Sequence, residues 1–454
     1  LRFNDGSSDY LNRTPSSAGN RKTWTWSGWV KRSKIERCHL FCGSAAGGNT
    51  VGTALRFSYQ DQQVELYDYV VGFTFQTYSE ASLKDPSAWY HIVVACDSNN
   101  GSGTNRMRLY INGSEVTDFT TDTNPSSGTD LIAENMDEFN IGRSVDQVGG
   151  AGLFDGYITE FVYIDNDQLD ATSFGEFDED SPTIWKPKDV SGLTFGNNGF
   201  YLEFKETGTS ANSSGAGADT SGNDRHHSVT NLAAADQRVD TCTNNFATLN
   251  PLERSPNSIT FTDGNTTASG TSGNSGRFTG GTYSPRKGKW WCELKVTVSG
   301  SYPIFGAIDA DSNMKFDGTY FVGSESAPYQ SGFAAFSNAD VYHNDDNNYG
   351  NWQTYSTNDI IGMGIDMDAS PPTLTFVKNG SNEETFNMET PNSGHYTFPA
   401  VGLYMAAAIA YFNFGSPPYA ISSGNADQNG YGNFEYAPKT NYYSMCSKNI
   451  AEFG

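Results

Sequence analysis

The sequence predicts an all-β protein made of two consecutive antiparallel β-sandwich domains of the jelly-roll type, joined by a polar linker. Aromatic residues make up 14 % of the chain and glycines number 48, a composition that favours pleated strands and tight turns. Apolar residues recur with a period of two, and the best helical candidates are two short turns at 168–174 and 231–237. At 454 residues the chain is too long for one core, so we expect strand in more than a third of it.

One arrangement of strands occurs twice along the chain. In each half an alternating run is followed by a polar loop, a second alternating run and an Asn-Gly pair, which is the strongest short-range signal for a β-hairpin. The elements are 90–95, 107–111 and Asn112-Gly113 in the first half, and 361–367, 374–377 and Asn379-Gly380 in the second. The repetition predicts one sandwich in each half.

The domain boundaries follow from changes in composition. We expect a first sandwich at 1–205, a polar linker or belt at 206–255, a second sandwich at 256–420 and an irregular aromatic tail at 421–454. The middle segment is rich in Gly, Ser and Ala, and its apolar end at 246–252 favours a belt over a plain tether. The tail aromatics require burial, either on the second domain or on a neighbouring chain. They are Tyr431, Phe434, Tyr436, Tyr442, Tyr443 and Phe453.

The charge of the chain excludes one class of partner. Its 52 acidic and 28 basic residues give −24, which repels phosphate backbones, so we expect no nucleic-acid binding. No run approaches the roughly 20 apolar residues that a membrane helix needs. Calcium remains open, because the loop 97–105 carries Asp and Asn oxygens, although without an ordered ligand spacing. The chain opens at Leu1, so we expect processing or further residues upstream.

The cysteines and histidines predict no metal centre. Six cysteines without paired spacing are expected to be free thiols, with Cys96 and Cys292 as small core residues. Cys38 and Cys42 lack the second pair that a zinc site requires. His226-His227 lies in the polar middle segment and is interpreted as a solvated pair.

The first half resembles laminin-G-like (concanavalin A-like) domains, through the motifs 1–4, 9–11, Trp24-Thr25-Trp26-Ser27-Gly28-Trp29-Val30, 89–91, 109–113, 139–142 and 154–158. The resemblance implies that the first strand, at 1–4, pairs with the last, near 200–204. Because this fold also hosts glucanases, we looked for their Glu-x-Asp-x-x-Glu strand. The nearest run, 176–181, has Ser181 in place of the second carboxylate, and neither Gly-x-Ser-x-Gly nor His-Glu-x-x-His occurs. We therefore expect no catalytic residues and no enzyme.

The second half resembles a SPRY-type sandwich in the motifs 288–293, 360–366, 374–380 and 398–403. With the segments 198–204 and 240–251, nearly the whole chain is similar to tail-fibre or lectin-like virion proteins of marine bacteriophages. This resemblance implies a non-enzymatic appendage on the virion surface that binds a host glycan or protein. It would assemble with itself, as a trimer in a fibre, and with other virion proteins. The alternatives are a purely structural virion subunit and a bacterial extracellular adhesin or filament subunit.

The predicted ligand site is an aromatic and amide-rich segment of the second domain, 342–352. Aromatic rings would stack on the C–H faces of a sugar, while amides and carboxylates would bond its hydroxyls. An ordinary exposed loop, with Trp352 at the start of a core strand, is the alternative. The candidate residues are Tyr342, Asn344, Asp345, Asn347, Tyr349 and Trp352.

Overall fold

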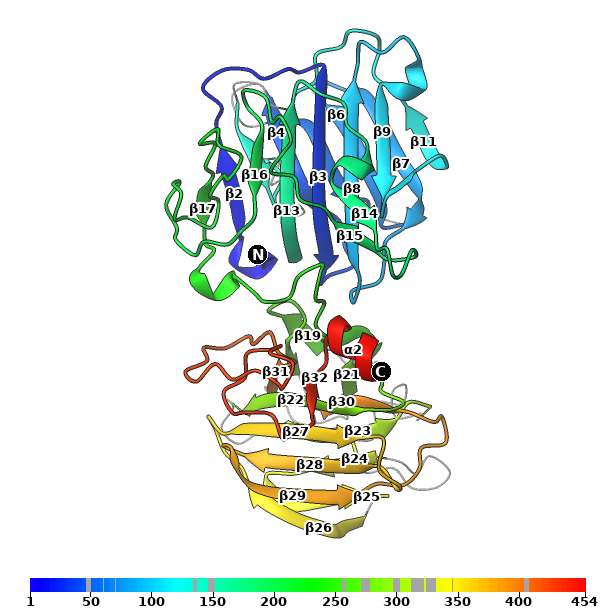
Figure 1. Ribbon diagram of the computed structural model, residues 1–454, viewed down its shortest axis with the longest axis vertical. Helices are drawn as coiled ribbons and strands as arrows, with labels where there is room; N and C mark the ends of the chain where they lie inside the picture. Colours follow the sequence, from blue (N-terminus) through cyan, green and yellow to red (C-terminus); the bar gives the residue numbers. More distant parts are fainter. Residues whose placement is uncertain are drawn as a thin grey trace. The chain divides into compact units, whose positions relative to one another are not determined.

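The computed structural model describes residues 1–45, 50–59, 61–69, 71–133, 137–145, 152–254, 259–270, 278–296, 303–311, 322–323, 332–344, 346–403 and 408–454 (Figure 1). Strands make up 47 % of the chain, which confirms the all-β prediction. The described helices are short, and none is long and apolar enough to cross a membrane. They are η1 (Asp5–Ser7), η2 (Gly103–Asn105), η3 (Ala171–Ser173), η4 (Ala234–Asp236) and α2 (Ser447–Phe453).

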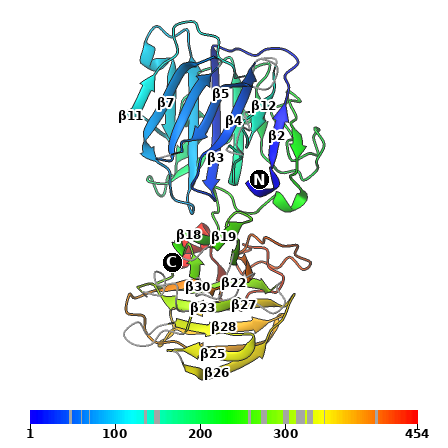
Figure 2. The same ribbon diagram turned by 180° about the vertical axis from the view of Figure 1, so that it is seen from behind.

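The first compact unit, Leu1–Gln237, is a sandwich of two antiparallel sheets. Figure 1 looks onto its seven-stranded sheet and Figure 2 onto its eight-stranded sheet. The first runs β1 (Arg2–Phe3), β13 (Gly156–Asp165), β3 (Thr23–Arg32), β8 (Trp89–Asp97), β9 (Met107–Ile111), β10 (Ser114–Glu115), with β16 (Phe200–Leu202) also on β13. The second runs β11 (Phe119–Thr123), β7 (Phe73–Ser82), β6 (Gln63–Tyr69), β5 (Thr50–Phe57), β4 (Cys38–Ala45), β12 (Phe139–Ile141), β2 (Tyr10–Arg13), β17 (Ser228–Thr230).

Both faces of the seven-stranded sheet are covered, which the sequence did not predict. Ile92, Val94 and Cys96 of β8 face the core between the sheets. Val93 and Ala95 alternate with them and pack in a second cluster on the outer face. The hairpin of β14 (Gly175–Phe177) and β15 (Trp185–Pro187) lies across that face in Figure 1. Alternation such as that of 90–95 predicts a half-buried strand, and this prediction is wrong here because a later segment folds back over the outer side of β8.

The two ends of the first sandwich do not pair with each other, contrary to the implied pairing of 1–4 with 200–204. Both pair with β13 along one edge: Arg2 lies opposite Tyr157, and Leu202 lies opposite Phe161. Glu160, with φ of 51°, interrupts the register of β13 between the two contacts. The ten-residue β13 offers enough length for two short strands in line, so this edge is still covered.

The second compact unit, Arg238–Gly454, is also a sandwich of two antiparallel sheets. One runs β18 (Leu249–Arg254), β21 (Phe278–Gly281), β30 (Tyr396–Gly402), β23 (Ile304–Asp309), β24 (Gly332–Ala335), β25 (Asn338–His343), β26 (Asp346–Thr354). The other runs β19 (Ile259–Thr262), β20 (Thr267–Gly270), β31 (Ile409–Asn413), β22 (Lys289–Val296), β27 (Ile360–Asp366), β28 (Thr373–Lys378), β29 (Ser381–Asn387). Both predicted hairpins are confirmed, because positive φ angles occur at Asn112 and Gly113 between β9 and β10, and at Asn379 and Gly380 between β28 and β29.

The boundary between the compact units falls between Gln237 and Arg238, inside the segment expected to link the domains. Its first part belongs to the first sandwich, because β17 adds to β2 and His227 is buried against the ring of Phe200, with centroids 4.5 Å apart. His227 is therefore not part of a solvated pair; burial lowers its pKa to about 3. Its later part supplies β18 of the second sandwich. Polar composition alone did not reveal these apolar attachments.

The aromatic tail packs on its own domain. β32 (Tyr443–Ser444) pairs in parallel with β22, and Phe434, Tyr442 and Met445 are buried. Buried Glu293 accepts hydrogen bonds from the amides of Tyr436 (2.8 Å) and Glu435 (3.0 Å). Of the six tail aromatics, Phe434 and Tyr442 are thus buried on their own domain, and Tyr431, Tyr436, Tyr443 and Phe453 are half-buried.

Candidate functional site

The segment 342–352 is a β-hairpin rather than a loop. β25 and β26 pair directly, with His343 opposite Asp346, so a tight turn replaces the expected binding loop. Asp345 lies outside the described residues, and so does the side chain of Asn347. Asn344 stands at the turn with φ of 55° and is half-buried.

The aromatic residues of this hairpin do not form one surface. Trp352 is 8 % exposed, and its ring centroid lies 5.3 Å from that of Phe376 in the core. It stands near the end of β26 rather than at the start of a core strand. Tyr342 packs on Phe336 with ring centroids 4.3 Å apart. Tyr349 is 39 % exposed, and its hydroxyl donates to the Asn387 carbonyl at 2.6 Å. Only Tyr349 presents an open ring, so this hairpin does not provide the stacking platform that the sequence suggested.

A row of polar and aromatic side chains crosses the eight-stranded sheet of the first domain. The strand registers place His39 opposite Arg56, Arg56 opposite Glu65, Glu65 opposite Tyr78, and Tyr78 opposite Thr121. The row therefore runs through β4, β5, β6, β7 and β11, the strands on the near face in Figure 2.

Successive side chains of a strand point to opposite faces of the sheet, and those of this row point away from the core. Leu55 and Phe57 flank Arg56 in the chain and point into the core, as do Val64 and Leu66 on either side of Glu65. The side chains between them lie on the outer face of the sheet.

Neighbouring groups hold Arg56 rigidly within the row. Its guanidinium donates to Glu65 through Nη2 to Oε1 at 2.7 Å and Nε to Oε2 at 2.5 Å, a bidentate pair. It also lies over the Tyr67 ring, 4.5 Å from the centroid. Gln76 Nε2 donates to Glu65 Oε1 (3.0 Å) and to the Tyr78 hydroxyl (2.8 Å). The network fixes a charged pair, an amide and a phenol in a pre-formed geometry.

A shallow depression of about 360 Å³ lies over this row from Arg56 to Thr121. The exposed ring of Tyr59 (76 % exposed) stands at its edge, in the turn between β5 and β6. Its lining is Arg37, Arg56, Ser58, Tyr59, Asp61, Gln63, Glu65, Tyr78, Thr120 and Thr121. A second depression of about 410 Å³, lined by Glu80, Ala81, Ile111 and residues 114–118, contains neither an aromatic ring nor an arginine. The first depression therefore combines the groups that ligand recognition needs.

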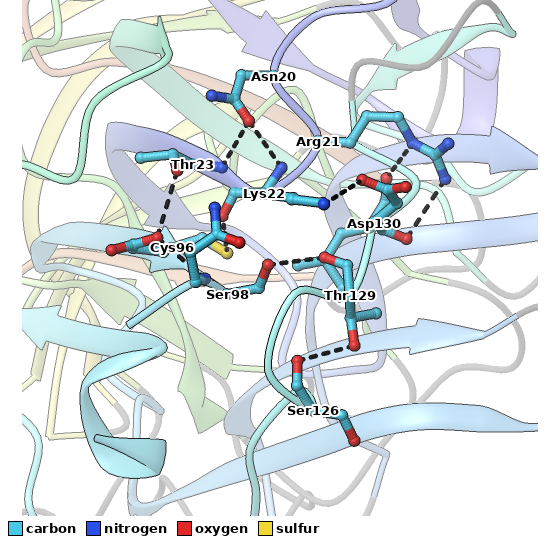
Figure 3. A network of polar contacts seen from close by, with 12 residues as sticks. Asn20, Arg21, Lys22, Thr23, Cys96, Ser98, Ser126, Thr129 and Asp130 are labelled. Atoms are coloured by element: carbon cyan, nitrogen blue, oxygen red, sulfur yellow. Dashed lines mark hydrogen bonds and ion pairs between the residues drawn. The ribbon is translucent and has the colours of Figure 1, made fainter. Parts of the chain in front are cut away.

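The loop 97–105, the candidate for calcium, uses its oxygens within the protein (Figure 3). Asp97 Oδ1 accepts from Thr23 Oγ1 (3.4 Å) and from the Asn99 amide (3.1 Å), and Ser98 Oγ donates to the Thr129 carbonyl (2.7 Å). On the neighbouring loop, Lys22 Nζ lies 3.8 Å from Asp130. Among the described residues, no group of three His, Cys, Asp or Glu side chains is placed to hold a metal ion.

A buried Ser–His pair in the first domain is not arranged as a nucleophile and its base. Ser27 Oγ lies 2.8 Å from His91 Nε2, and Trp185 Nε1 donates to His91 Nδ1 at 2.9 Å. Burial lowers the pKa of His91 to about 3, so the ring is neutral. Because Nδ1 is the acceptor, Nε2 carries the proton and donates to Ser27. His91 therefore cannot take a proton from Ser27 in this arrangement.

The acidic run 176–181 belongs to the hairpin over the outer face of the first domain. Asp178 Oδ2 accepts from Lys186 Nζ at 3.1 Å, and Asp178 Oδ1 accepts from the amides of Asp180 and Ser181 at 3.0 Å. The Lys186 hydrogen bond holds the pKa of Asp178 below its ordinary value. Asp178 thus closes a turn and carries an ion pair.

Sequence reasoning did not find the row through Arg56 and Glu65. An isolated charge between apolar neighbours usually indicates a solvated face, and strand order in a sheet is not written in the chain. One signal was available: Arg56 and Glu65 each stand between two apolar residues, so a hairpin that joins their two strands would pair opposite charges.

The first domain is similar to one known protein family. Residues 5–170 match the family described as the Concanavalin A-like lectin/glucanases superfamily (Laminin_G_3). A search of curated proteins found no match. Among solved structures, the SPRY domain of human HERC1 is 13 % identical, covers 36 % of this chain and 96 % of its own, and gives a TM-score of 0.29.

Two further solved structures were compared. A putative carbohydrate binding protein from Bacteroides ovatus is 14 % identical (50 % of this chain, 56 % of its own, TM-score 0.34). A SAP-like pentraxin from Limulus polyphemus is 18 % identical (36 % and 71 %, TM-score 0.27). The match at 5–170 agrees with the laminin-G resemblance, and the first domain is similar to the concanavalin A-like lectin/glucanases superfamily.

Proposed function

We propose that the chain is a non-catalytic binding protein whose first domain recognises carbohydrate in the depression beside Tyr59. The observation that carries this proposal is the row Arg56–Glu65–Tyr78, which presents fixed hydrogen-bonding groups on the open face of a sheet. Sugars offer vicinal hydroxyls to such groups and apolar C–H faces to aromatic rings. The lectin members of the superfamily matched at 5–170 support the same proposal.

The depression suits a saccharide better than a protein surface. Its roughly 360 Å³ falls within the range of small-ligand sites, whereas a protein partner requires a larger area with apolar anchors. The row is polar, and its charged pair is already compensated, so a neutral hydroxyl can bond to it without leaving an unpaired charge. Tyr59 supplies an open ring at the edge of the depression.

We propose a non-catalytic protein because the glutamate and the histidine that could act as acid or base already have other partners. Glu65 is committed to Arg56 and Gln76, and His91 is a donor toward Ser27. Glycoside cleavage requires two carboxyl groups on opposite sides of one glycosidic bond. Glu65 and Asp61 are the carboxylates that line the depression, and Glu65 already forms a bidentate pair with Arg56.

A glycan array probed with the full chain tests this function. We compare the wild type with Tyr59→Ala and with Tyr349→Ala, which removes an exposed tyrosine from the second domain. Binding that is lost in Tyr59→Ala and kept in Tyr349→Ala supports the first-domain site. The opposite pattern would move the site to the hairpin 342–352, and a folded wild type that binds no glycan would leave the purely structural role.

We further propose, on the sequence resemblance to marine phage proteins, that this recognition takes place on a virion appendage as part of a self-associated fibre, with a trimer as the favoured state. Antibody labelling of purified particles in electron micrographs tests the location, and light scattering at micromolar concentration tests the assembly. Labelling of appendages together with a trimer mass supports the proposal. Unlabelled particles would favour the adhesin or filament alternative, and a monodisperse monomer would count against the fibre.

A further inference from the structure

Arg37 lines the depression without a partner of its own. It directly precedes β4, and within the described residues its guanidinium makes no hydrogen bond or ion pair. Its Nε is buried and unsatisfied. By contrast, nearby Arg32 donates to the Leu83 carbonyl and to Gln62, while Arg56 is paired with Glu65. A buried N–H donor such as Nε is costly to leave without an acceptor, and a ligand in the depression can supply one.

Among the described residues that line the depression, Arg37 is the cation whose charge no ion pair compensates. Glu65 compensates Arg56, and His39 beside them is neutral, because burial, then the charges of Arg56 and Arg37, lower its pKa to about 3. Asp61 at the rim is exposed, so water screens its charge. The depression therefore offers the Arg56–Glu65 pair to sugar hydroxyls and, at another point, the uncompensated guanidinium of Arg37.

We propose that the saccharide bound in this depression is anionic and places a carboxylate or sulfate on the Arg37 guanidinium. The proposal rests on the carbohydrate-binding function proposed above and names the chemical class of its ligand. Arginine presents a planar fork of N–H donors that matches the paired oxygens of such groups. Hydroxyls of the same sugar would lie against Arg56, Glu65 and Tyr78.

Binding of an acidic glycan could not arise from general electrostatic attraction to this protein. The chain carries −24, so a polyanion is repelled by the protein as a whole and is retained only through local contacts. Retention of an acidic glycan by so acidic a protein therefore reports a built site.

Affinity electrophoresis of the full chain tests the proposal with three probes of matched size: polygalacturonate, which carries carboxylates, dextran sulfate, which carries sulfates, and neutral dextran. The variants are Arg37→Gln and Arg37→Lys. The control Arg108→Gln removes an equal charge from an arginine paired with Glu115 on the other sheet. Thermal melting confirms that each variant is folded. We expect Arg37→Gln to weaken binding of the anionic probe at least about tenfold and Arg37→Lys to restore part of it, while Arg108→Gln has no effect.

Asp61→Asn supplies a second test that does not depend on a half-buried side chain. Removing this exposed carboxylate from the rim should strengthen anionic binding by about twofold to fivefold. Whichever of polygalacturonate and dextran sulfate is retained identifies the anionic group. Equal retention of neutral dextran, or anionic binding unchanged by both Arg37→Gln and Asp61→Asn, would overturn the inference and leave carbohydrate binding intact. Failure of the wild type to bind any glycan on the array would instead remove the proposed function itself.

Discussion

Asn112, in the turn after β9, makes two hydrogen bonds with His91 of the neighbouring strand β8. Asn112 Oδ1 accepts from the His91 amide at 2.9 Å, and the Asn112 amide donates to the His91 carbonyl at 2.8 Å. Asn379 and Ile360 repeat the arrangement in the second domain at 2.9 and 2.8 Å. In each domain, the hairpin asparagine thus ties its turn to the strand that precedes the hairpin, β8 in the first domain and β27 in the second.

Replacing these asparagines with glycine should destabilise each domain separately. Glycine keeps the positive φ of the turn but removes the side-chain acceptor, so the His91 or Ile360 amide loses its partner. We expect Asn112→Gly and Asn379→Gly each to lower the free energy of unfolding by about 1–2 kcal/mol. Calorimetry measures the effect, with exposed Asn105→Gly as the control. A loss no larger than the control's would show that the clasp adds nothing.

The two domains should respond to acid in opposite directions. In the first domain, burial lowers the pKa values of His39, His91 and His227 to about 3. The unfolded chain therefore binds more protons below about pH 6.5, and each histidine removes roughly 1.4 kcal/mol of stability per pH unit as the pH falls toward 3. Asp155, whose pKa burial raises to about 7, opposes this trend, but one group does not outweigh three.

In the second domain, burial raises the pKa of Glu293 to about 7. The stability that it contributes is fully present below about pH 4.5 and is lost as the pH rises through 7. Calorimetry at pH 7.5 and pH 5 should show the first-domain transition falling and the second-domain transition rising. Glu293→Gln identifies the second transition by removing its pH dependence. Parallel shifts of both transitions would contradict the assignment.

The tail should come loose when its polar anchors are removed. Asp427 Oδ2 accepts from the Ser444 amide (2.8 Å), Ser444 Oγ (2.7 Å) and Asn449 Nδ2 (2.8 Å), and Glu293 holds the Tyr436 amide. We expect trypsin to cleave at Lys439 and Lys448 at least about tenfold faster in Asp427→Ala and Glu293→Ala than in the wild type. Exposed Glu384→Ala is the control, and equal cleavage in all four proteins would refute the anchoring role.

Binding of an anionic glycan should be strongest at intermediate ionic strength. At 10 mM salt the Debye length is about 30 Å and the net charge of the whole chain repels the ligand, whereas at 150 mM it is about 8 Å and the contact with Arg37 persists. Titrations at about 10 mM, 150 mM and 1 M salt should therefore give an affinity that rises and then falls. A steady fall from the lowest salt would indicate general ionic attraction and count against the site.

The sequence predicts those parts of the fold that local chemistry decides. Asn112-Gly113 and Asn379-Gly380 define their hairpins because few other pairs adopt two consecutive positive φ angles. It does not predict which strands become neighbours, so the cover over Val93 was missed and the pairing of 1–4 was misassigned.

The candidate site depends even more on long-range pairing. Trp352 had the composition of a binding residue, yet its place in a strand that faces the core buries it. Arg56, Glu65 and Tyr78 became one row only when three strands aligned. Composition indicates that aromatic and polar groups are available, and the register decides which of them meet on an open face.

Hydrogen–deuterium exchange of the full chain, with and without its bound glycan, tests whether the glycan binds in the depression beside Tyr59. Binding there should slow exchange in peptides covering β6 and β11, which contribute residues to the depression. Peptides covering 342–352 in the second domain should exchange at an unchanged rate. Protection confined to 342–352, or none in either region with glycan bound, would show that the depression of the first domain is not the binding site.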